Sequence, residues 1–60
     1  MLAIFTTMDS DLKNRNNYIV EIIRQLTNKE CDIADVGYMY KIKFQDGFIT
    51  DAFEDELIFL

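Results

Sequence analysis

The chain has 60 residues, half of them hydrophobic and eight of them aromatic, and a formal net charge of −5. A chain of this length forms one small domain, which buries only about 60% of the surface of its unfolded form and leaves little room for an enclosed active site. A single cysteine and the lack of histidine exclude an intramolecular disulfide, a Cys/His zinc cluster and histidine-dependent catalysis.

The first predicted element is the apolar stretch LAIFTT, residues 2 to 7, which we interpret as a strand at the edge of a sheet. The stretch lacks a basic leader and is too short for a secretory signal, and no part of the chain approaches the roughly 20 apolar residues that span a membrane. We therefore expect a cytoplasmic protein with no membrane partner, folded as one domain over residues 1 to 60.

Residues 18 to 26, YIVEIIRQL, fit either a helix or a strand. A helix would place four apolar side chains on one face: Ile19, Ile22, Ile23 and Leu26. A strand would place Tyr18, Val20 and Ile22 on one face. Four β-branched residues among the first six, preceded by the turn-prone NRNN, favour the strand.

Residues 38 to 44, YMYKIKF, carry apolar side chains at every second position, the period of a half-buried strand. Asp46 and Gly47 follow, and this pair supplies the positive φ angles of a tight hairpin turn. The pattern predicts a β-hairpin, in which Tyr40 and Phe53 are expected to lie in the core.

Two registers of this hairpin are open. A loop of Asp46 and Gly47 alone would set Phe44 opposite Ile49 and turn Asp51 toward the buried face. A three-residue loop with a bulge would set Phe44 opposite Phe48 and turn Asp51 outward. Because burial of an unpaired carboxylate is costly, the pattern favours the bulged register or a second bulge near Asp51.

Four strings, VEIIRQLT, ECDIADVG, MYKIKFQDG and DAFEDEL, together resemble a group of short, uncharacterised bacterial proteins, many of them carried on mobile elements, that look like SH3-like small β-barrels. The resemblance covers residues 18 to 57. It implies a mainly β fold of about five strands in a strongly bent sheet, in which EDEL forms a 3₁₀ turn before IFL, the last strand. The alternative is a β-α-β-β fold, with residues 11 to 28 as a helix on a three-stranded sheet.

The C-terminal half is strongly acidic: residues 30 to 60 carry a net charge of −6, and residues 1 to 29 carry +1. This half repels phosphate backbones, so we expect no direct binding of nucleic acid. Its densest part lacks the ligand spacing of a calcium loop and the cleft of an acid/base pair, so no metal, cofactor or catalytic residue is assigned. The carboxylates of this part are Asp51, Glu54, Asp55 and Glu56. They either stabilise a helical turn and keep an edge strand soluble, or bind a basic surface of another protein.

Two aromatic residues complete the predicted partner-binding set, Tyr38 and Phe48, at opposite ends of the hairpin. Phe48, next to the turn, is the better candidate for an interface anchor. Both ends of the chain are apolar, and two apolar edge strands side by side would pair between protomers, which predicts a homodimer.

These features favour a non-enzymatic interaction module, a small acidic barrel that covers a surface of a partner protein. If the gene travels on a phage or mobile element, the alternative is an anti-defence inhibitor, such as an anti-CRISPR, that occupies a basic nucleic-acid channel by imitating phosphate charge. A third alternative is a structural accessory protein that assembles only with itself.

Overall fold

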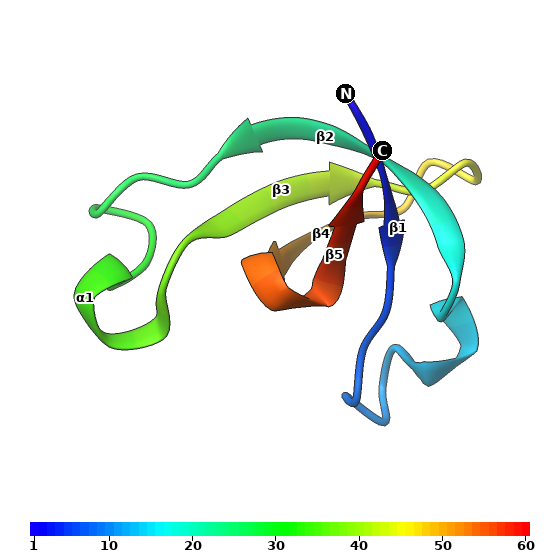
Figure 1. Ribbon diagram of the computed structural model, residues 1–60, viewed down its shortest axis with the longest axis horizontal. Helices are drawn as coiled ribbons and strands as arrows, with labels where there is room; N and C mark the ends of the chain where they lie inside the picture. The colour runs from blue at the N-terminus through cyan, green and yellow to red at the C-terminus, as the bar shows by residue number, and fades with distance from the viewer.

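The computed structural model describes all 60 residues, and five antiparallel strands form one curved sheet (Figure 1). The strands are β1 (Leu2–Phe5), β2 (Tyr18–Gln25), β3 (Met39–Lys43), β4 (Ile49–Phe53) and β5 (Leu57–Phe59). Three short helical turns connect them: η1 (Lys13–Arg15), α1 (Ile33–Val36) and η2 (Glu54–Glu56). None of these turns has the length and apolar character that a membrane crossing requires.

The strand order across the sheet is β4-β3-β2-β1-β5. The prediction of a mainly β fold with about five strands and short helical turns is confirmed, and η2 stands between β4 and β5 where the resemblance placed it. The alternative helix over residues 11 to 28 is wrong, because this segment holds only the short turn η1 and then the whole of strand β2. The placement of the first strand at an edge is also wrong, because β1 lies between β2 and β5.

The sheet curves along strand β2, which pairs with a different neighbour over each half of its length. Its first half pairs with β1, where Ala3 faces Val20, and its second half pairs with β3, where Ile22 faces Ile42. The pairing register with β3 shifts between Ile22 and Arg24, as at a β-bulge, which bends a strand and increases its twist. Figure 1 shows β2 arching over the rest of the sheet.

The β3–β4 hairpin adopts the bulged register. The Phe44 N–H donates to the Phe48 carbonyl at 2.8 Å, and Ile42 faces Thr50. Gly47 has φ +92°, which glycine adopts without strain, and the Asp46 carboxylate accepts the Phe48 N–H at 3.1 Å. The prediction that Asp51 turns outward is confirmed.

The core lies on the concave side of the sheet and takes residues from every strand. Its seven buried side chains are Ala3, Phe5, Val20, Ile42, Phe44, Ala52 and Leu57. The rings of Phe5 and Phe44 meet edge to face with centroids 5.3 Å apart, a favoured aromatic geometry. Tyr40 packs half-buried against this cluster, as expected.

Phe53 is outside the core, so its predicted burial is wrong. Its side chain is 40% exposed, whereas that of Ala52 is fully buried. Successive side chains of a strand point to opposite faces, and the bulged register assigns the inner face to Ala52. Phe53 therefore lies on the outer face, opposite Met39.

Candidate partner-binding surface

We call the four predicted carboxylates the acidic run: Asp51, Glu54, Asp55 and Glu56. Glu56 differs from the other three because it has a structural role. One carboxylate oxygen accepts the Phe53 N–H at 2.9 Å, and the other accepts the Thr7 hydroxyl at 2.5 Å. The carboxylate thus stabilises η2 and ties it to the segment after β1. Glu56 is half-buried, and both of its oxygens are occupied within the chain.

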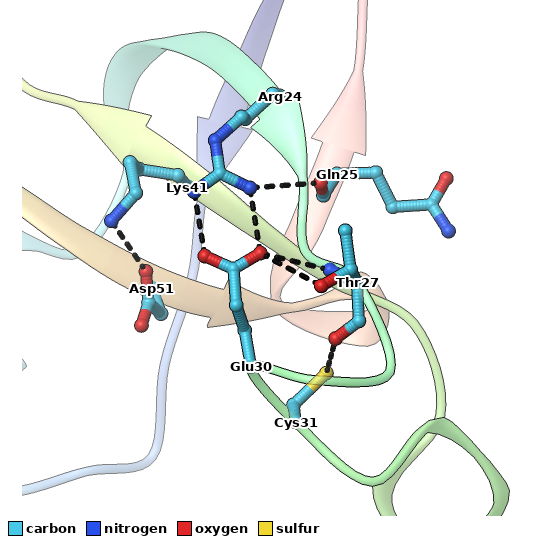
Figure 2. Close-up of polar contacts among 7 residues, drawn as sticks. All are labelled: Arg24, Gln25, Thr27, Glu30, Cys31, Lys41 and Asp51. Carbon is cyan, nitrogen blue, oxygen red and sulfur yellow. Dashed lines mark hydrogen bonds and ion pairs between the residues drawn. The ribbon is translucent and has the colours of Figure 1, made fainter.

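Asp51 also has an intramolecular partner. It faces Lys41 across the hairpin, and its carboxylate lies 3.5 Å from the Lys41 ammonium (Figure 2). Opposite charges in such a cross-strand pair stabilise a hairpin modestly. Two of the four predicted carboxylates therefore form contacts within the protein.

Glu54 and Asp55 are exposed, and their side chains form no hydrogen bond or ion pair. The backbone N–H of Glu54 donates to the Tyr38 carbonyl at 3.0 Å, which holds η2 against the start of β3. The two acids line a shallow depression together with Val36, Gly37 and Tyr38. This contact brings Tyr38 beside two of the predicted acids.

Exposed apolar side chains lie next to these two carboxylates: Val36 and Tyr38 line the same depression, and Phe53 lines a neighbouring one with Asp55. Tyr38 is 50% exposed and Val36 is 42% exposed, and Phe53 directly precedes Glu54. We call this set the Tyr38 surface: Val36, Tyr38, Phe53, Glu54 and Asp55. Sequence reasoning missed Val36 and Phe53, although the alternation of Ala52 and Phe53 in the bulged register could have identified Phe53.

Phe48 lies away from the Tyr38 surface, at the turn end of the hairpin. Figure 1 shows this turn and α1 at opposite ends of the molecule. The Arg15 guanidinium stacks over the Phe48 ring at 4.1 Å and over the Phe44 ring at 4.8 Å. It also pairs with Asp46 at 3.1 Å, and together with the Phe48 N–H it lowers the pKa of the Asp46 carboxyl. Phe48 therefore belongs to a separate cation–π cluster that the sequence did not reveal.

A third ion pair joins β2 to the loop that leads to α1. The Glu30 carboxylate accepts hydrogen bonds from both terminal nitrogens of Arg24, at 2.7 and 2.6 Å, and from the N–H and hydroxyl of Thr27 (Figure 2). The Arg24 contacts, followed by the Thr27 N–H, lower the pKa of Glu30 from 4.5 to about 2. The Cys31 thiol contacts the Thr27 carbonyl at 3.7 Å within the same turn.

The side chains that ligate metals do not gather in groups of three anywhere in the structure. Comparison with protein-family models, with curated proteins and with solved structures finds no match to this chain. The geometry of the surface is therefore the basis for a functional assignment.

Proposed function

We propose that the protein is a non-enzymatic interaction module that covers a basic surface of a partner protein with its Tyr38 surface. One observation carries the proposal: two carboxylates without intramolecular partners, Glu54 and Asp55, line one depression with exposed Val36 and Tyr38, and Asp55 lines a second with exposed Phe53. Aromatic side chains supply contact area at an interface, and charge complementarity sets the association rate and the specificity.

The chemistry of this surface suits lysine and arginine side chains of the partner. The aliphatic stem of such a side chain packs on an aromatic ring, while its charged group meets a carboxylate. Two hydrogen bonds fix the backbone of the Tyr38 surface. The Glu54 N–H donates to the Tyr38 carbonyl, and the Phe53 N–H donates to the Glu56 carboxylate. A fixed surface loses less conformational entropy on binding than a mobile one.

The test compares two charge reversals of equal size. Glu54→Lys with Asp55→Lys changes the Tyr38 surface, and Asp9→Lys with Asp11→Lys makes the same change among exposed residues of the loop before η1. The wild-type protein is used to capture partners from a lysate of its native host, and the captured protein is then titrated with each variant. We expect the first pair to weaken binding at least tenfold and the second to change it less than threefold.

Equal binding by all three proteins would overturn the electrostatic part of the proposal. Tyr38→Ser tests the apolar part, and it is expected to weaken binding without changing its salt dependence. Acidic imitation of nucleic acid, the alternative that rests on the resemblance, makes a different prediction. In that case DNA competes with the protein for its partner, and rising salt weakens the complex steeply.

A further inference from the structure

The sheet has two edge strands, β4 and β5, which differ in how well they are protected against pairing with another strand. A free edge exposes unpaired backbone groups, and proteins protect such edges with charges or by covering the groups. Strand β4 has both protections: Asp51 stands at its centre, and the Glu56 carboxylate accepts the Phe53 N–H. Pairing of β4 with another β4 about Asp51 would set two carboxylates directly opposite each other.

Strand β5 is less protected: it carries no charged side chain, and of its two outward N–H groups only that of Leu57 is covered, by the Glu54 carbonyl. Its residues Leu57, Ile58 and Phe59 are apolar, and so is Leu60 after them. Ile58 is 56% exposed and Leu60 is 68% exposed. An edge with apolar, uncharged side chains and a free backbone N–H is the kind at which another strand pairs.

The hydrogen bonds to β1 show which backbone groups of β5 are free. The Thr6 N–H donates to the Glu56 carbonyl, and the Leu60 N–H donates to the Leu2 carbonyl. Hydrogen-bonded pairs alternate along an antiparallel ladder, so the N–H and C=O of Phe59 point away from β1. No other group of the chain bonds to the Phe59 N–H.

The outer face of the sheet beside this edge is also apolar. Ile58 of β5 faces Ile4 of β1, and Ile4 faces Ile19 of β2, which places three isoleucines in a row across the sheet. The backbone bond of Leu60 to Leu2 aligns these two leucines next to the row. On the inner face, the Phe59 ring packs against Tyr40 with centroids 5.5 Å apart, which fixes the strand.

We propose that β5 pairs with β5 of a second copy of the chain, antiparallel and about a two-fold axis at Phe59. In this register each Phe59 N–H donates to the Phe59 carbonyl of the other copy, and Ile58 faces Leu60 of the other copy. Every facing pair is apolar, and the same groups serve both protomers, so the contact closes as a dimer. Pairing of β5 with β4 of another copy would set Asp51 against apolar residues and would leave one β4 and one β5 edge of each pair free to add further copies.

The dimer is expected to dissociate on dilution. A standard interface buries about 800 Å² per partner, and the whole monomer exposes 4302 Å². One short strand pair with its flanking side chains covers a small part of that surface. Sedimentation velocity from about 1 mM to about 1 µM protein spans the affinities of such contacts.

Two matched comparisons test the interface in the full chain. Ile58→Glu puts a charge on the proposed edge, and Ile49→Glu puts the same charge on β4, where it faces Lys43. N-methylation of the Phe59 amide, introduced by chemical synthesis with ligation at Cys31, removes one proposed donor and leaves every side chain in place. N-methylation of the Asp51 amide on the β4 edge is its control.

Ile58→Glu and N-methyl-Phe59 are expected to raise the dissociation constant of the dimer at least about 100-fold, because each leaves a buried polar group unpaired. Ile49→Glu and N-methyl-Asp51 are expected to dimerise as the wild type does. Circular dichroism establishes that each monomer is folded. If Ile58→Glu is unfolded, the comparison of N-methyl-Phe59 with N-methyl-Asp51 tests the interface. A wild type that stays monomeric at about 1 mM, or a dimer that survives both changes at β5, overturns the proposal.

Discussion

The guanidinium of Arg24 and the carboxylate of Glu30 form a bidentate ion pair with N–O distances of 2.7 and 2.6 Å (Figure 2). Arg24 is in β2 just after the bulge, and Glu30 is in the turn that begins at Thr27. The pair therefore ties the end of a strand to the loop that carries α1. Planar, two-point contacts of this kind are among the stronger charge-assisted hydrogen bonds.

The pKa of Glu30 gives a test of this ion pair. Folding lowers it from 4.5 to about 2, so the contact stabilises the folded state above pH 4.5, and this contribution is lost as the pH falls through about 2. Arg24→Gln is expected to raise the Glu30 pKa toward 4.5, measured by NMR titration of its carboxyl carbon. Lys29→Gln also removes one positive charge, but Lys29 forms no ion pair with Glu30, so this variant is expected to leave the Glu30 pKa low. A Glu30 pKa that stays low in Arg24→Gln would assign the shift to another cause.

The acidic run is expected to divide into structural and free members. Glu56→Ala removes acceptors for the Phe53 N–H and the Thr7 hydroxyl and should lower the free energy of unfolding by about 1–2 kcal/mol. Asp55→Ala removes an exposed carboxylate without partners and should change the free energy of unfolding by less than about 0.5 kcal/mol. Urea unfolding measures both. Equal losses would show that Glu56 is no more structural than Asp55.

The two faces of the hairpin are expected to respond differently to loss of one methylene. Ile42 is fully buried, so Ile42→Val should cost about 0.5–1.5 kcal/mol of unfolding free energy. Ile49 is half-exposed on the outer face, so Ile49→Val should cost less than about 0.5 kcal/mol. Thermal and urea unfolding of the two variants check the register, because the two-residue loop would bury Ile49. A larger loss in Ile49→Val than in Ile42→Val would contradict the bulged register.

The cation–π cluster at the turn is expected to add to stability. Arg15→Ala removes the guanidinium from the Phe44 and Phe48 rings and should lower the free energy of unfolding by about 1 kcal/mol. Lys13→Ala, in the same 3₁₀ turn, removes an exposed cation and should have little effect. The pKa of Asp46 should rise in Arg15→Ala, because the first cause of its lowering is the Arg15 contact. An unchanged unfolding midpoint in Arg15→Ala would show that the stack adds nothing.

Local patterns in the sequence predict the elements whose partners are close in the chain. The alternation over residues 38 to 44 and the Asp46-Gly47 turn predict the β3–β4 hairpin, and the cost of burying Asp51 selects its register. The β-branched residues of 18 to 26 predict β2 in place of a helix. In each case the preference depends on side-chain direction and turn geometry, which neighbouring residues determine.

Contacts between distant residues are the part that the sequence could not predict. Arg15 meets Asp46 across 31 positions, and Thr7 meets Glu56 across 49. Nothing local distinguishes Glu56 from Glu54, yet only Glu56 reaches the Thr7 hydroxyl. The four carboxylates form one patch in the sequence because they lie within six positions, and the structure divides them because Lys41 pairs with Asp51 and Thr7 bonds to Glu56, whereas Glu54 and Asp55 have no partner.

The sequence by itself determined the small mainly β domain, the hairpin and the acidic character of the second half. Only the tertiary structure decided that β1 lies inside the sheet, that Phe53 faces outward and that β5 is an apolar edge strand. The reason is geometric: alternation along a strand defines two faces, and the order in which the strands pair decides which face is buried and which strand stays at an edge.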